Sequence, residues 1–148
     1  MEIRRKAYIK LDEWKKRKNH KPLIVEGLRQ VGKSYIVDKF ARENYNNVIT
    51  FDFRHKKELT AIFSGDLDVD TIIRKAKLFF TDKKFDTENT ILIFEEIGDC
   101  PLARTSLKSF ALDGKYDVIA TGSLLGVINF RRKNKVNIHT GYEKYLNM

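Results

Sequence analysis

Short, continuously apolar runs recur along this chain, and segments with helical spacing of their apolar residues separate them. A run without polar alternation indicates a strand that is buried on both faces. Strands of this kind with helices between them predict a parallel sheet that is covered by helices on both sides. We therefore predict an α/β fold with about five parallel strands. The predicted strands are residues 23–25, 47–53, 90–94 and 116–121, with 135–146 as a candidate fifth, and the predicted helices are residues 7–18, 33–43, 56–63, 69–80, 102–112 and 124–130.

The composition predicts one domain over residues 1–148. Hydrophobic residues make up 42% of the chain, enough for one core, and the sequence has two prolines and no flexible linker or internal repeat. No apolar stretch approaches the roughly 20 residues that span a bilayer, and no apolar block follows the basic N-terminus as in a secretory signal. The single cysteine, Cys100, excludes a disulfide framework and is predicted to pack at the entry of a helix. We expect a cytoplasmic protein without a membrane partner.

The net charge of +9 is concentrated at the two ends of the chain. Residues 1–21 contain nine basic and three acidic residues, and residues 131–148 contain five and one, whereas residues 22–130 are almost balanced. Basic ends can bind nucleic acid through its phosphates. The simpler interpretation, which we favour, is a solvated face on the basic helix at 7–18 and a charged tail.

A phosphate-binding motif lies between the first predicted strand and the next helix. Gly27, Gly32, Lys33 and Ser34 match G-x-x-x-x-G-K-[ST] in the strand–helix setting that this motif requires, which makes a chance match in a glycine turn the weaker alternative. Backbone N–H groups would converge on a phosphate at the positive end of the helix. Lys33 would reach the β- and γ-phosphates, and the Ser34 hydroxyl would bind Mg²⁺. The predicted nucleotide-binding residues are Gly27, Gln30, Val31, Gly32, Lys33, Ser34 and Tyr35.

Two carboxylates, Glu95 and Glu96, end the predicted strand at 90–94. Ligands of doubly wound sheets lie at the carboxyl ends of the strands, so this strand would bring both acids to the phosphates. Glu95 would hold Mg²⁺ through its water, and Glu96 would polarise the water that attacks the γ-phosphate. A pair of solvated acids is the alternative. A nucleotide kinase would activate a substrate hydroxyl instead, so the paired acids favour hydrolysis.

Other polar residues near the strand ends have two interpretations each. Thr121 and Ser123 follow an apolar strand, and the Ser123 hydroxyl would either contact the γ-phosphate or its attacking water, which we favour, or cap the next helix. Asp52 ends the second strand and either faces the site or is structural. The three histidines, at positions 20, 55 and 139, have no metal-ligand spacing, so we assign no metal site beyond nucleotide-bound Mg²⁺.

Taken together, these motifs resemble the bacterial and archaeal AAA+-type ATPases described as AAA-domain proteins, whose full-length members usually continue into a C-terminal domain of unknown function. The resemblance implies a P-loop sheet in which the strand before the phosphate loop and the strand before Glu95 are separated by the strand at 116–121. It also implies ATP hydrolysis, with Lys33 and Ser34 as the Walker A pair, Glu95 and Glu96 as the Walker B pair and Ser123 as a sensor-like residue. The similar stretches, in the family's order between residues 3 and 127, are EGLRQVGKS, GDLD, ILIFEEIGDCP, SLKSF and ATGSLLGV.

The sequence departs from that family in three places. Glu95 stands where the family usually has aspartate, and its extra methylene could displace Mg²⁺, whose geometry is strict. Gly98 stands where the family commonly has glutamine, which weakens the expected sensing of the γ-phosphate. The chain ends without room for a lid module, as in a natural short form or an excised domain. Arg131 and Arg132 follow the sensor segment, either as a finger acting on a neighbour's nucleotide or, as we favour, as part of a basic tail.

The leading hypothesis is therefore a Mg²⁺-dependent, ATP-hydrolysing AAA+-like core. The alternatives are a nucleotide-binding interaction module that does not hydrolyse ATP, suggested by Glu95, and a nucleic-acid-associated factor that uses the basic ends. Homo-oligomers and nucleic-acid or protein partners at those ends remain open. Adenine is favoured over guanine because no guanine-reading N-K-x-D stretch is present.

Overall fold

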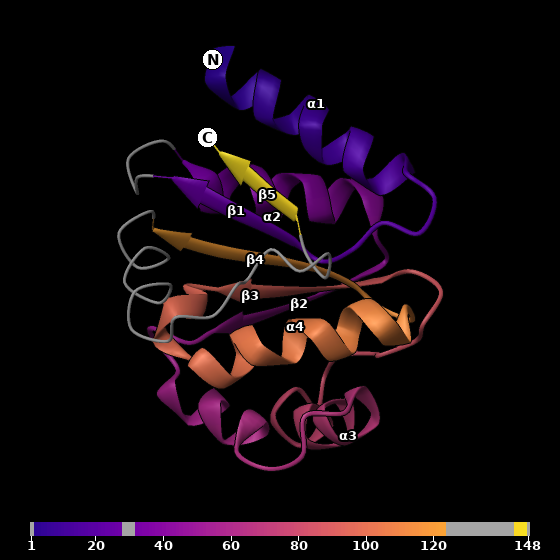
Figure 1. Cartoon of the computed structure of the whole chain (residues 1–148), viewed down its shortest axis with the longest axis vertical. Coiled ribbons are helices and arrows are strands. Elements are labelled where there is room, and N and C mark those ends of the chain that lie inside the picture. Colours follow the sequence, from indigo (N-terminus) through magenta and orange to yellow (C-terminus); the bar gives the residue numbers. More distant parts are fainter. Residues whose placement is uncertain (1, 28–31, 124–143, 148) are drawn as a thin grey trace.

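The computed structural model describes residues 2–27, 32–123 and 144–147. Its elements form three layers, with the sheet in the middle and helices on both faces (Figure 1). The helices are α1 (Glu2–Lys16), α2 (Lys33–Asn44), α3 (Val69–Phe79) and α4 (Pro101–Asp113), with the 3₁₀ helices η2 (Lys57–Phe63) and η3 (Ile97–Asp99). The strands are β1 (Leu23–Gly27), β2 (Asn47–Asp52), β3 (Thr90–Glu95), β4 (Asp117–Ser123) and β5 (Lys144–Asn147).

The five strands form one parallel sheet in the order β2-β3-β4-β1-β5. This confirms the predicted α/β fold and the separation of β1 from β3 by β4. The fifth strand falls at the end of the segment predicted for it. The helix predicted at residues 124–130 and the finger candidates Arg131 and Arg132 lie outside the described residues.

Side chains alternate between two buried clusters, one on each face of the sheet, because successive residues of a strand point to opposite faces. Ile91 and Ile93 of β3 join the cluster formed with α1 and α2, whereas Leu92 and Phe94 join the cluster formed with η2, α3 and α4. The second cluster contains Cys100, which is buried at the start of α4 and has the predicted packing role. The sheet is thus covered on both faces and open to ligands at its strand ends.

Two elements differ from the prediction. The basic helix begins at Glu2 rather than Ala7. Its residues Ala7, Leu11 and Trp14 are buried against the sheet and α2. The segment predicted as an α-helix at 56–63 is the 3₁₀ helix η2, whose buried residues are Leu59, Ile62 and Phe63. Among the described helices, none is long and apolar enough to cross a bilayer.

Candidate nucleotide-binding site

The predicted site residues converge because the strands that carry them are parallel and end at the same edge of the sheet. Gly27 ends β1 beside Ser123, its register partner at the end of β4. Glu95 ends β3 beside Asp52, its register partner at the end of β2. The backbone of Ser123 is therefore placed at the site, but its side chain, like Gln30 and Val31, lies outside the described residues.

The beginning of α2 has the properties of an anion-binding site. Gly32 precedes the helix with φ 75° and ψ 31°, a left-handed conformation that favours glycine. It provides no side-chain cap, and the first turn has no acidic residue, so no acidic side chain of that turn neutralises the positive end of the helix dipole. Lys33 is 2% exposed, whereas Ser34 and Tyr35 are exposed to solvent. These residues fit a bound phosphate.

Glu96 lies between two cations. One carboxylate oxygen, Oε1, is 3.9 Å from Lys33 Nζ, and the other, Oε2, is 3.6 Å from Arg54 Nη2. The residue adopts a left-handed conformation, with φ 55° and ψ 59°, that costs energy for a side chain with a Cβ. Its N–H donates to the buried hydroxyl of Thr121 at 3.2 Å. This hydrogen bond fixes the turn that aims the Glu96 carboxylate between the cations.

Arg54 and Thr121 are two residues near Glu96 whose contacts the sequence did not reveal. Arg54 follows the end of β2, and its Nε donates to Asp99 Oδ2 at 2.9 Å, a hydrogen bond that raises the pKa of the guanidinium. In the sequence, the only indication of a role for Arg54 was that a basic residue directly follows the predicted strand at 47–53. Thr121 was noted beside Ser123, but its contact with Glu96 depends on the pairing of β3 with β4.

Glu95 and Ser34, the two predicted magnesium ligands, line the same two adjoining hollows. One, of about 280 Å³, also contains Asp38, Thr50 and Thr121. The other, of about 270 Å³, contains the cluster around Lys33, Arg54 and Glu96. The described residues include no group of three or more His, Cys, Asp or Glu side chains suited to a metal ion. One hydroxyl and one carboxylate fit Mg²⁺ that is completed by phosphate oxygens and water.

Asp52 has both of the roles that were considered for it. It lines the hollow that contains Lys33 and Glu96, and it also closes the turn after β2. Its Oδ1 accepts the backbone N–H of His55 at 3.1 Å, and its Oδ2 is 2.9 Å from the ring Nδ1. Burial alone raises the pKa of the Asp52 carboxyl, but the hydrogen bonds from His55 outweigh it, so the net pKa is lowered.

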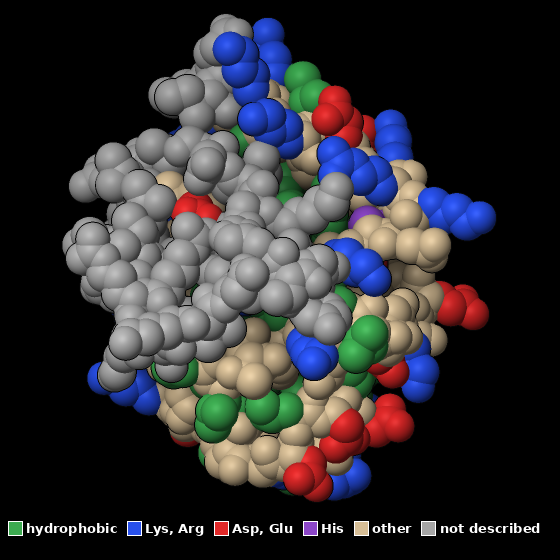
Figure 2. Space-filling model, in the orientation of Figure 1, with side chains coloured by type: hydrophobic (Ala, Val, Ile, Leu, Met, Phe, Trp, Pro, Cys, Tyr) green, Lys and Arg blue, Asp and Glu red, His purple; other side chains and the backbone are tan. Residues whose placement is uncertain are grey.

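The basic helix α1 reaches the phosphate loop through Arg4. The guanidinium carbon of Arg4 lies 4.7 Å from the centre of the Tyr35 ring, and Nε and Nη2 lie 3.0 Å from where a Cβ on Gly32 would be. Arg4 is therefore part of the site edge rather than of a solvated face. Other basic residues of α1, such as Arg5 and Lys10, are exposed as predicted, and Figure 2 shows Lys and Arg side chains around this end of the molecule.

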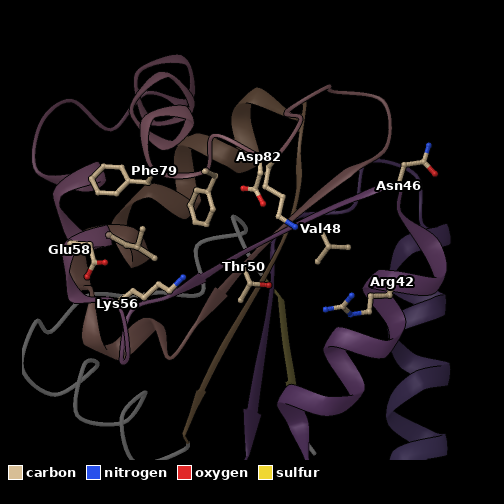
Figure 3. A pocket seen from close by; sticks show the side chains of 11 residues that line it. Arg42, Asn46, Val48, Thr50, Lys56, Glu58, Phe79 and Asp82 are labelled. Carbon is tan, nitrogen blue, oxygen red and sulfur yellow. The ribbon is translucent and has the colours of Figure 1, made fainter.

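A larger hollow of about 530 Å³ lies along the edge of β2, away from the phosphate loop (Figure 3). Thr50 of the strand, Lys56 before η2 and Phe79 at the end of α3 are among the residues that line it. Its lining contains none of the predicted nucleotide-site residues. Size alone therefore does not mark the site, which is identified by its polar groups.

Comparisons with known proteins agree with the fold. A family described as "AAA domain" matches residues 19–143, so this chain belongs to that family. Among solved structures, the chain is similar to the Orc1 protein of Aeropyrum pernix in complex with DNA, with a TM-score of 0.54 and 15% sequence identity. That match covers 97% of this chain and 44% of the Orc1 chain. A search of curated proteins finds no relative that matches.

The family and the fold define the chain as an AAA+-type P-loop core, a class of ATP-binding module. The sheet order required by this class is present, and β1 ends at Gly27 shortly before α2 begins at Lys33. At 15% identity the Orc1 structure shares the fold alone, and this chain spans less than half of its length.

Proposed function

We propose that this chain is a Mg²⁺-dependent ATPase domain. The observation that carries the proposal is the position of Glu96, whose carboxylate lies 3.9 Å from Lys33 Nζ at the beginning of α2. A phosphate-binding cation and a carboxylate that can orient water are thus side by side, as hydrolysis of a terminal phosphate requires.

In this proposal each residue has a role that follows from its position in the site. The N–H groups at the start of α2 and the Lys33 ammonium bind the β- and γ-phosphates of ATP. Bound Mg²⁺ would neutralise negative charge on those oxygens, with Ser34 and Glu95 as the groups that hold it or its water. Glu96 accepts a hydrogen bond from the attacking water. Thr121 keeps the Glu96 backbone in place, so the carboxylate does not have to reorganise during the reaction.

The test is calorimetric titration with ATP and Mg²⁺ followed by a phosphate-release assay. Lys33→Ala should weaken ATP binding at least about tenfold, equivalent to roughly 1.4 kcal/mol. Lys77→Ala, on the exposed surface of α3, is the matched control and should bind ATP like the parent. ATP binding without phosphate release would select the non-hydrolysing interaction module instead. Equal affinities for the parent and Lys33→Ala would contradict the assignment of the phosphate loop.

A second candidate, association with nucleic acid, is favoured by the exposed basic residues Arg5 and Lys10 of α1 and by exposed Arg17 directly after that helix. Contacts of this kind neutralise phosphates, so the affinity for DNA or RNA should fall steeply with salt. A gel-shift titration between low and physiological ionic strength measures this. No retardation at low salt would reject the candidate and would leave the ATPase proposal unaffected.

A further inference from the structure

Arg54 is placed at the site by its backbone and held there by an acid. It follows β2 by two residues, at the edge of the sheet where β3 delivers Glu95 and Glu96. Its Nε donates to Asp99 Oδ2 at 2.9 Å, and its Nη2 lies 3.6 Å from Glu96 Oε2. The side chain is 34% exposed, so one side of the guanidinium remains open to the hollow.

The two contacts of Arg54 differ in strength. A charge-assisted hydrogen bond between nitrogen and a carboxylate is normally about 2.7–2.9 Å long. The contact of Arg54 with Asp99, at 2.9 Å, is therefore a hydrogen bond, whereas the contact with Glu96, at 3.6 Å, is too long to be one. These two contacts use Nε and Nη2, and a guanidinium has five N–H groups in a planar fork. Arg54 can therefore exchange Glu96 for a better acceptor while Asp99 still holds Nε.

A nucleotide in this site would supply that acceptor during hydrolysis, when negative charge develops on its γ-phosphate oxygens. With phosphates bound to Lys33, the γ-phosphate enters the hollow that Lys33, Arg54 and Glu96 share. The described charged groups around this hollow are three acids (Asp52, Glu95 and Glu96) against Lys33 and Arg54, so a polyanion adds negative charge that only nearby cations can offset. Arginine matches phosphate oxygens in a bidentate manner, which a single loose contact with Glu96 cannot rival.

We propose that Arg54 is a catalytic residue that contacts the γ-phosphate in the transition state and is supplied by the same chain. This inference rests on the proposed ATPase function and extends it. In hydrolysis the water oxygen bonds to the γ-phosphorus, and the bond from phosphorus to the β–γ bridging oxygen breaks, with its electron pair remaining on ADP. One water proton stays on the phosphate product, and the other leaves through Glu96 to solvent. Arg54 stabilises the charge that develops on the γ-oxygens, and its departure from Glu96 frees that carboxylate to orient water.

The decisive experiment compares Arg54→Ala and Arg54→Lys with Arg74→Ala, an exposed arginine of α3. Arg54→Ala should lower phosphate release by roughly 10²–10³-fold, the usual effect of removing a transition-state donor. The dissociation constant for ATP should change less than about threefold, because the group acts mainly in the transition state. Arg54→Lys should recover little activity, since an ammonium cannot replace the fork. Thermal unfolding of each variant checks that the fold is intact.

A second readout separates a direct contact from a merely structural role. The parent chain with Mg²⁺ should bind ADP more tightly when fluoroaluminate, a mimic of the transferring phosphoryl group, is present, and Arg54→Ala should lose this gain while it binds ADP alone normally. Unchanged or faster phosphate release by Arg54→Ala would overturn the inference and make Arg54 a restraint on Glu96. No phosphate release by the parent would overturn the proposed ATPase function as well, so the two failures are distinguishable.

Discussion

Lys33 and Glu96 face each other at the strand ends, with the ammonium nitrogen 3.9 Å from a carboxylate oxygen and both side chains largely withdrawn from solvent. Lys33 begins α2 and Glu96 lies in the turn between β3 and η3, so the two residues come from segments that are far apart in sequence. Buried opposite charges at this distance stabilise one another and compete with any ligand that binds either one. The pair therefore links phosphate binding by Lys33 to the freedom of the Glu96 carboxylate.

Glu96→Gln is expected to separate ATP binding from hydrolysis. The substitution keeps the shape of the side chain but removes the charge that competes with phosphate for Lys33, so ATP affinity should be unchanged or higher. Phosphate release should fall by about 10²–10⁴-fold because an amide cannot act as a base. Glu58→Gln, an exposed change in η2, is the control. Weaker ATP binding by Glu96→Gln in calorimetry would show that the carboxylate holds the metal instead.

Glu95→Asp is expected to increase turnover. Glu95 lines both hollows beside Ser34, and Mg²⁺ tolerates little deviation from octahedral geometry. Shortening the carboxylate by one methylene should raise phosphate release by roughly tenfold. Substitution of residues that orient metal-bound ligands changes activity by about 10–100-fold, so this estimate is at the lower end of that range. The same shortening at Glu96 should lower release, which makes Glu96→Asp the matched control. Equal rates for the parent and Glu95→Asp would show that the longer acid already suits the metal.

Gly32→Ala is expected to impair both folding and nucleotide binding. Its φ of 75° costs a side chain about 1–2 kcal/mol, and the new Cβ would lie 3.0 Å from two nitrogens of Arg4. Gly114→Ala is a stringent control because its φ is 71°, yet nothing lies within 4 Å of a Cβ there. Both variants should lose similar stability in urea unfolding, but only Gly32→Ala should lose ATP affinity. Normal ATP binding by both would place the phosphates away from Gly32.

His20→Asn is expected to remove a pH-dependent part of the stability. His20 Nε2 lies 2.7 Å from Asp117 Oδ1 and Nδ1 lies 2.9 Å from the carbonyl oxygen of Arg17, so both ring nitrogens face acceptors and the protonated ring satisfies both. The hydrogen bond with Asp117 raises the pKa of His20 above its ordinary 6.5. Burial alone raises the pKa of Asp117, but hydrogen bonds from His20 and Tyr45 bring it below its ordinary 3.8.

These shifts fix the pH range of the effect. The contribution of His20 is fully present below pH 6.5 and is lost as the pH rises through its raised folded-state pKa, whereas that of Asp117 is present above pH 3.8 and is lost as the pH falls through its lowered one. His20→Asn should cost roughly 1–2 kcal/mol at pH 5.5 and less at pH 9 in urea unfolding. His55→Asn, in an exposed pair, should cost little at either pH. An equal cost of His20→Asn at both pH values would exclude this linkage.

The sequence by itself determined the strands and their burial, and it contains the motif from which we predict a phosphate loop. These features are local, because a buried strand must be apolar along its whole length and a loop around phosphate needs glycines and a lysine at fixed spacing. The sites of Lys33, Ser34, Glu95 and Glu96 at one sheet edge followed from the parallel arrangement of those strands. The 3₁₀ geometry of η2 did not follow, because burial three residues apart also suits an α-helix.

Only the tertiary structure decided which further residues complete the site. Thr121 and Ser123 are two positions apart in a strand, so the alternation of side chains assigns both to the same face and cannot choose between them. The pairing of β3 with β4 brings the Thr121 hydroxyl to the N–H of Glu96. Arg54 and Arg4 reach the site from the end of β2 and from α1. Contacts between distant segments leave no periodic pattern in the sequence, because they depend on how the elements pack and not on spacing along the chain.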